Sequence, residues 1–408
     1  EANEKMPNSA LRVVAMGLKD CHEAPQQVTI GQMENNLIFT GLLGMIDPAR
    51  PEVIDAVKKC KTAGIRAVMI TGDHKSTALA IAREIGIYRE GDVSITGAEL
   101  EKLSDEELEE SVRRFSVYAR VAPEHKVRIV KAWQRHSEVV AMTGDGVNDA
   151  PALKQADIGA AMGIVGTDVA KGASDMILTD DNFATIVSAV EEGRRIYDNI
   201  LKVIQYLLST NVGEIFLILV TSIFNMGMPL LPIHILWINL VTDSLPALAL
   251  SVDPPEKGIM NRKPRNTMQG FMTRGMIWRV MYQGLMVGII PLVSYIVGLH
   301  DGGEKLGRTM AFVTLMFAQL VHVRNLHSNE KSSFLFNPLN NKPLIGAIFV
   351  SALIGLIVLL VPPVREAFSL AVMDRWHWIM VILMALAPIP VVELFKLLKI
   401  NGTQGDKD

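Results

Sequence analysis

About six long apolar segments occupy the second half of this 408-residue chain. Each is close to the roughly 20 residues that an α-helix needs to cross the hydrocarbon core of a bilayer. Buried core helices of a soluble protein would not be this long and this numerous. We therefore predict an all-α membrane domain of about six spans, in contact with membrane lipid. The limits read from the sequence are 200–224, 233–252, 277–298, 307–325, 343–363 and 375–397.

The first half carries charge at the density of an ordinary soluble domain and alternates short apolar runs with amphipathic stretches. Alternating strands and helices favour an α/β fold with a doubly wound parallel sheet. Ligands of such sheets bind where strands end, and Thr-Gly-Asp tripeptides follow two of the runs, at 71–73 and 143–145. Residues 100–115 are rich in Glu and Arg and predict an exposed helical insertion without chemistry. The predicted strands are 65–70, 139–142, 158–162 and 176–178, with a helix over 76–85.

Charge and cysteine content exclude several functional classes. The net charge is −3, so we expect no nucleic-acid partner. The two cysteines, Cys21 and Cys60, cannot build a disulfide framework and do not form a CxxC metal motif. We interpret them as reduced cytosolic thiols.

A cluster of polar residues in the first half suits phosphoryl transfer. Asp145 and Asp149 lie four residues apart on a predicted strand-to-helix turn, where carboxylates could hold Mg²⁺ beside a phosphate. Lys126 could neutralise a phosphoryl group, and Thr71 could donate a hydrogen bond to it. Each residue alone has an ordinary explanation: a solvated lysine, a turn, or a helix N-cap at Asp149. The ordered set at successive strand ends favours the phosphoryl-transfer interpretation.

The amino-acid sequences of these motifs resemble those of the haloacid-dehalogenase-type phosphorylation domain of P-type ATPases. The chain reads MITGD at 69–73, ARVAPEHK at 119–126 and MTGDGVNDAPALK at 142–154. The resemblance implies ATP as substrate and Mg²⁺ as cofactor. It also implies a role for each residue. Asp145 would bind Mg²⁺, supported by Asn148 and Asp149, and Lys126, Thr71 and Gly72 would contact the phosphoryl group. Asp73 would lie in the loop where the actuator domain docks, and Arg12 and Arg120 would contact the nucleotide.

The sequence departs from that family in one large respect. Its members carry Asp-Lys-Thr-Gly-Thr, whose aspartate is phosphorylated, and these 408 residues contain no such motif. The actuator domain, most of the nucleotide domain and the first four spans of the family are not found either. We therefore expect a C-terminal part that works with the N-terminal part of the same pump. The expected regions are 1–36 (end of the nucleotide-binding domain), 37–182 (phosphorylation domain without its nucleophile segment), 183–200 (stalk helix), 201–400 (transmembrane domain) and 401–408 (tail).

Polar residues inside the apolar segments predict an ion site, because a carboxylate in a membrane is costly. In the first segment Asn211 and Glu214 lie three residues apart, which favours one helix face. In the second, Asn239, Thr242 and Asp243 share a face, and the nearby Pro246 should loosen the helix. Their oxygens suit a hard cation such as Ca²⁺. Two alternatives remain open. Asn239 and Thr242 could form hydrogen bonds between helices, and Glu214 could be an acid at a helix end near the membrane interface.

These two segments are very similar to the fifth and sixth spans of sarcoplasmic-reticulum-type calcium pumps. The resemblance implies that all five residues ligate transported Ca²⁺. Gln319 is a departure, since two-site calcium pumps have a glutamate at that place, and it is a possible further ligand.

The leading hypothesis is an ATP-driven Ca²⁺ pump with an aspartyl-phosphate cycle. A pump for Na⁺, Mn²⁺ or another cation is one alternative, and a membrane-anchored phosphatase-like or non-catalytic fragment is another. A soluble half that uses ATP must be cytosolic, and an even number of spans then places the tail in the cytosol as well. Lys and Arg in the loop near 253–276 agree with this orientation. The tail lacks a retrieval signal, so we favour a bacterial plasma membrane.

Overall fold

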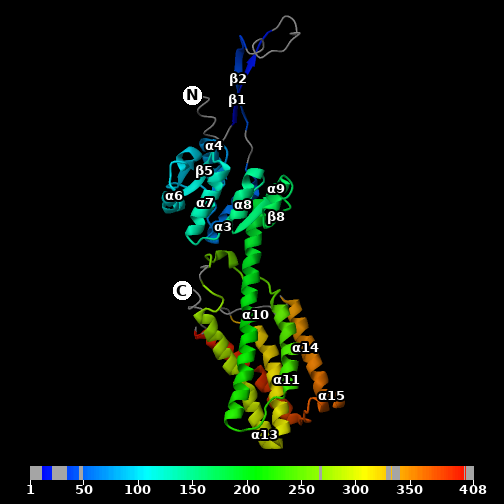
Figure 1. Ribbon diagram of the computed structural model, residues 1–408. Coiled ribbons are helices and arrows are strands. Elements are labelled where there is room, and N and C mark those ends of the chain that lie inside the picture. The colour runs from blue at the N-terminus through cyan, green and yellow to red at the C-terminus, as the bar shows by residue number, and fades with distance from the viewer. Residues whose placement is uncertain are drawn as a thin grey trace. The chain divides into compact units, whose positions relative to one another are not determined.

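The computed structural model describes residues 12–20, 35–45, 49–265, 269–327, 332, 341–398 and 400 (Figure 1). The chain divides into two compact units. Unit 1 comprises Glu1–Glu191 with Met260–Thr267, and unit 2 comprises Glu192–Ile259 with Met268–Asp408. Each unit is described by itself below.

The parallel strands predicted for the first half are present in unit 1, as two three-stranded sheets. In each sheet the strands run parallel, as expected of an α/β domain. One sheet has the order β3-β5-β4 and the other has the order β6-β7-β8. The strands are β3 (Met69–Thr71), β4 (Val93–Thr96), β5 (Phe115–Ala119), β6 (Ala141–Gly144), β7 (Ile158–Met162) and β8 (Met176–Leu178).

One helix, α7 (Pro123–Arg135), serves the cores of both sheets. Ile129 of α7 packs in a cluster with Tyr118 of β5, and the next residue, Val130, packs in a cluster with Met142 of β6. Ile70 of β3 touches both clusters. The shared helix therefore packs against both sheets. The other helices of unit 1 are α3 (Pro51–Thr62), α4 (Lys75–Glu84), α5 (Gly97–Leu100), α6 (Asp105–Ser111), α8 (Ala150–Gln155) and α9 (Asp168–Gly172), with turns η2 (Val112–Arg114) and η3 (Val147–Asp149).

An antiparallel pair precedes these sheets. Strand β1 (Arg12–Leu18) pairs with β2 (Ile38–Met45), with a register shift between Met16 and Gly17. Several large apolar side chains of the pair are exposed, Phe39 at 66% among them.

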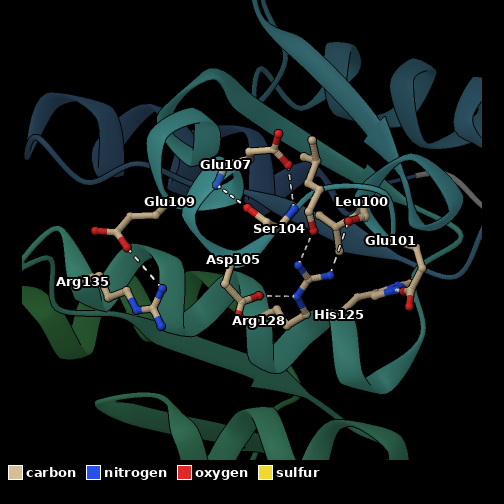
Figure 2. Close-up of polar contacts among 10 residues, drawn as sticks. Leu100, Glu101, Ser104, Asp105, Glu107, Glu109, His125, Arg128 and Arg135 are labelled. Carbon is tan, nitrogen blue, oxygen red and sulfur yellow. Dashed lines mark hydrogen bonds and ion pairs between the residues drawn. The ribbon is translucent and has the colours of Figure 1, made fainter.

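The insertion predicted for residues 100–115 is helical and largely exposed, as α6 (Asp105–Ser111) and its neighbours show, but the prediction is wrong for its apolar residues, which enter the core. Leu100, Leu108 and Val112 are fully buried and belong to the core cluster of the first sheet. The many charges misled the interpretation, because only one face of this segment needs to be apolar for it to pack on α7. Figure 2 shows the polar edge of this contact, where Arg128 donates to Asp105 Oδ1 at 2.8 Å and to the Leu103 carbonyl at 2.6 Å.

Unit 2 is helical, and the described part of the chain holds five helices long and apolar enough to cross a membrane. The longest, α13, has non-helical dihedrals at Gly302 and Gly303, so it contains two of the six predicted spans. The count is therefore consistent with about six. The candidate spans are α10 (Phe183–Ile223), Pro232–Leu250, α13 (Arg274–Asn325), α14 (Lys342–Leu360) and Arg375–Leu397, which comprises α16 (Arg375–Leu386) and α17 (Pro388–Leu397). A short helix, α15 (Pro362–Ala367), follows α14. The turn η5 (Ile259–Asn261) lies between the second candidate span and α13.

The second candidate span is irregular in its middle. It begins as α11 (Pro232–Trp237), widens into the π-helix η4 (Ile238–Asp243) and ends as α12 (Ser244–Leu250). Pro246 has no N–H to complete the regular hydrogen-bond ladder, which is the reason for expecting the helix to loosen here. The loosened stretch contains Asn239, Thr242 and Asp243.

Candidate functional site

Asp149 organises the loop that follows β6 in unit 1. Its Oδ2 accepts hydrogen bonds from the backbone N–H groups of Asp145 and Gly146, each at 3.2 Å. Its Oδ1 accepts a hydrogen bond from the ammonium of Lys126, on the first turn of α7. Asp149 is only 6% exposed, so the ion pair is largely shielded from water. Both carboxylate oxygens are thus committed to holding the loop and the lysine.

Asp145 has the opposite character. Its side chain is exposed, and no hydrogen bond to its carboxylate is found among the described residues, while its carbonyl accepts from Thr167 N–H at 2.8 Å. The backbone is therefore held and the carboxylate is available. Asn148 is also exposed. Across the described ranges no group of three or more His, Cys, Asp and Glu could hold a metal ion. Mg²⁺ commonly needs only one or two carboxylates when phosphate and water complete its shell, which suits Asp145.

Gly144 makes the close approach of Asp149 possible. A Cβ atom at residue 144 would lie 2.4 Å from Cβ of Asp149, well inside contact distance. The glycine at this strand end is therefore required by packing.

Thr71, Gly72 and Asp73 follow β3 and form a tight turn. The Thr71 hydroxyl lies 3.0 Å from Asp73 Oδ2 and accepts from Asp73 N–H at 3.1 Å. The backbone carbonyl of Asp73 accepts from Arg120 N–H at 3.1 Å. This turn is thus joined to the segment that leads into α7, whereas Lys126 contacts Asp149 directly. Space around Gly72 is open.

The two predicted nucleotide residues are placed differently. Arg120 has a left-handed backbone (φ 51°) and an exposed side chain. Arg12 opens β1, but its side chain lies outside the described residues. The structure therefore brings together Asp145, Asp149 and Lys126.

Sequence reasoning missed His125 and Glu101, which hold the first turn of α7. His125 Nε2 lies 2.5 Å from Glu101 Oε2, and both residues are drawn in Figure 2. The Nδ1 atom of His125 accepts from Ala122 N–H at 3.1 Å. The hydrogen bond with His125 lowers the pKa of Glu101. The pair is 24 residues apart in sequence, and no local pattern predicts it.

The polar residues of the candidate spans form a second, separate cluster in unit 2. Glu214 of α10 is 4% exposed, and its Oε1 accepts from Gln319 Nε2 at 3.3 Å. Asn239 interacts with the same carboxylate. Asp243 is 1% exposed and lies within electrostatic range of Glu214.

Asp243 has two partners on α10 that sequence reasoning did not select. The Tyr206 hydroxyl lies 3.1 Å from its Oδ1, and the Thr210 hydroxyl lies 3.1 Å from its Oδ2. The spacing of Tyr206 and Thr210, at i and i+4, was the signal available in the sequence. Two further oxygens, Oγ1 of Thr242 and Oε1 of Gln319, are buried and lack a hydrogen-bond partner among the described residues.

Asn211 stands apart from this cluster. Its side chain is exposed in the described part of the chain, and its Nδ2 donates to the Leu207 carbonyl of its own helix at 2.6 Å. The structure thus links Glu214 with Asp243, Asn239 and Gln319, places the buried Thr242 next to Asp243, and leaves Asn211 outside.

Glycines bring α10 and α13 into backbone contact beside Glu214. A Cβ atom at Gly213 would lie 3.0 Å from the Gly284 carbonyl oxygen and 3.1 Å from the Gly288 nitrogen. Small residues at such a crossing are typical of packed membrane helices. The position of Glu214 therefore depends on this contact.

Two sequence families match different parts of the chain. Residues 16–157 match the haloacid dehalogenase-like hydrolases, and residues 227–398 match the C-terminus of cation-transporting ATPases. The first region contains the Asp145 loop, and the second contains the candidate spans after α10.

Curated relatives cover nearly the whole chain. It is 46% identical over 418 residues to calcium-transporting ATPase 1 of Bacillus cereus, spanning 98% of this chain and 47% of the relative. Identity is 48% over 385 residues with the calcium-transporting ATPase of Bacillus subtilis (94% and 43%). It is 39% over 432 residues with the endoplasmic reticulum calcium ATPase srcA of Aspergillus fumigatus (95% and 44%).

The chain therefore spans about half the length of the curated relatives it matches. Together with the long apolar helices, these relatives identify it as a multi-pass membrane protein. The two matched regions and the relatives agree with the resemblance drawn from the motifs, and the chain belongs to the cation-transporting P-type ATPases, whose C-terminal part it matches.

Proposed function

We propose that these residues form the C-terminal part of an ATP-driven Ca²⁺ pump that works through an aspartyl-phosphate intermediate. The observation that carries the proposal is the pair of carboxylates, Glu214 and Asp243, buried together among candidate membrane helices with oxygen-bearing partners. Buried carboxylates in a membrane are retained for ion binding. The relatives are named as calcium-transporting ATPases, which favours Ca²⁺ as the ion.

The Asp145 loop is proposed as the phosphoryl-transfer site. A bound Mg²⁺ would neutralise charge that develops on the phosphoryl oxygens. Asp145 would hold it, because its carboxylate is available. Asp149 would keep the loop and Lys126 in place, and Lys126 would add a fixed positive charge beside the phosphoryl group. Thr71 and Gly72 would contact the same group from the β3 turn, and Asn148 would support the metal.

The phosphorylated aspartate is proposed to come from residues outside these 408, on a strand between β3 and β6. Within the described residues β3 pairs only with β5, and β6 pairs only with β7. Ile70 packs against the cores of both sheets. A parallel strand added between these two edges would join the sheets, and its carboxyl end would lie beside Asp145 and Thr71.

The Ca²⁺ site would use Glu214, Asn239, Thr242 and Asp243, with Gln319 as a neutral further ligand. Oxygen donors of this kind suit Ca²⁺. Asn211 would join only if a partner segment covers its exposed side. A Na⁺ or Mn²⁺ pump is the second candidate, because the amide of Gln319 supplies less negative charge than a carboxylate.

We also propose that the soluble half and the tail face the cytosol, where ATP is available. Identity is 46–48% with the two Bacillus relatives and 39% with the endoplasmic reticulum protein, which favours a bacterial plasma membrane.

The test is phosphorylation by labelled ATP with and without Ca²⁺, on the full-length protein and on this 408-residue chain. We expect label on the full-length protein only, and loss of it in Asp243→Asn. Asp157→Asn is the matched control, because Asp157 accepts a backbone N–H at the other end of β6. Label that forms equally without Ca²⁺ would refute a Ca²⁺ pump. Label on the short chain would mean that its nucleophile lies among these residues.

A further inference from the structure

Four polar side chains form a stripe along one face of α10: Asn199, Lys202, Tyr206 and Thr210. Their spacing of i, i+3, i+7 and i+11 places them on one line of an α-helix. All four are buried, with exposures between 0% and 6%. We call these residues the polar stripe.

Every member of the polar stripe bonds to the segment from Asp243 to Asp253. The two C-terminal members, Tyr206 and Thr210, contact the carboxylate of Asp243. Asn199 Nδ2 donates to the carbonyls of Ser251 and Asp253, at 3.2 and 2.8 Å. Lys202 Nζ lies 2.7 Å from Asp253 Oδ2. The stripe thus joins α10 to the second candidate span at two places, one at the carboxylate proposed to bind the ion and one just beyond the end of α12.

Asp253 is the centre of the second place. Its side chain is fully buried. Its Oδ1 also accepts a hydrogen bond from Asn341 Nδ2 at 2.9 Å, and its Oδ2 lies 2.8 Å from His327 Nδ1. Asn341 is in turn the N-cap of α14, and His327 lies just beyond α13. One carboxylate therefore connects α10, the second span, α13 and α14.

Asp253 is ionised at neutral pH in this environment. Burial by itself would raise its pKa, but the hydrogen bond from His327 and the charge of Lys202 outweigh burial, and the pKa is lowered. A buried ion pair is strongly directional when its remaining lone pairs are also satisfied, as they are here.

We infer that the Lys202–Asp253 pair sets the register between α10 and the second span, and thereby the height of Asp243 relative to Glu214. Asp253 is a positioning residue in this inference: it acts on the ion site through the two helices and does not touch the ion. The inference rests on the proposed function for its effect on Ca²⁺, and on the stripe alone for its effect on register.

Two readouts in the full-length protein test the inference. The first is the Ca²⁺ concentration that gives half-maximal phosphorylation from ATP. In Asp253→Asn and in Lys202→Met we expect it to rise about tenfold, with the maximal level within about twofold, as for a change in binding and not in chemistry. The double variant should shift no further than the larger single change, because both remove one interaction. Lys257→Met removes an exposed charge from the same loop and should leave the value unchanged.

The second readout is a distance between spin labels at Leu208 of α10 and Leu248 of α12, in a cysteine-free background. Both positions are exposed in the described chain. We expect the mean distance to shift by about 3 Å, two residues of helix rise, in Asp253→Asn and Lys202→Met and not in Lys257→Met.

The outcomes separate the two claims. If the wild-type protein shows no Ca²⁺ response, the proposed function fails, and the label distance alone decides the inference. If it responds to Ca²⁺ but both variants keep the wild-type half-maximal concentration and label distance, the inference is overturned. A lowered maximal level at an unchanged half-maximal concentration would also overturn it.

Discussion

The side-chain nitrogen of Gln319 lies 3.3 Å from Oε1 of Glu214, and both residues are buried. One amide and one carboxylate therefore share the place where two carboxylates would repel each other. The side-chain oxygen of Gln319, Oε1, has no hydrogen-bond partner among the described residues.

Gln319→Glu should make the protein depend on a divalent cation for stability. Without an ion, a second acid beside Glu214 must be protonated or repelled, so we expect a lower melting temperature in chelator. With Ca²⁺, the added charge should bind it more tightly and restore the melting temperature. Thermal unfolding with and without Ca²⁺ measures this. Thr314→Val is the control, because it removes a buried hydrogen bond to Ser294 on the same helix without adding charge.

Lys126→Met should abolish phosphoryl transfer and leave Asp149 buried without its counter-charge. Loss of one partner from a buried pair costs about 3–5 kcal/mol when burial is complete, and less here because Lys126 remains 17% exposed. In the full-length protein we expect phosphoenzyme to fall at least about a hundredfold. Lys131→Met on the same helix is the control, and an equal loss there would argue for a folding defect.

Gly144→Ala should displace Asp149 and disorder the loop before it affects the sheet. The added methyl group would lie 2.4 Å from Asp149 Cβ, and overpacking of this kind costs about 1–3 kcal/mol. Gly172→Ala has open space and should be neutral or slightly stabilising. Hydrogen exchange of residues 145–149, compared between the two variants, measures the difference. Equal protection in both would contradict the close-packing argument.

The motifs and four of the parallel strands could be predicted from the sequence, because strand-end motifs such as those at Thr71 and Asp145 depend on local geometry, whereas β4 and β5 were not predicted. The break in α13 could be predicted too, since Gly302 and Gly303 lie between the predicted spans 277–298 and 307–325. The burial of Leu108 could not, because its neighbours are nearly all charged. Partners distant in sequence, such as Asp253 for Lys202, leave no local pattern at all.

Asp181 gives a prediction for acid stability in unit 1. Its carboxylate accepts from the N–H groups of Ile164 and Val165, each at 2.9 Å. These hydrogen bonds, with that of Ile164 the largest cause, lower its pKa. A carboxyl with a lowered folded-state pKa adds stability that is complete above its unfolded pKa of about 3.9 and is lost as the pH falls through the folded value. Asp181→Asn should therefore destabilise the protein at pH 7 and flatten its loss of stability below about pH 4. Thermal unfolding from pH 7 to pH 3, with the exposed Asp168→Asn as control, checks this. A parallel pH profile for wild type and Asp181→Asn would show that the carboxylate contributes nothing.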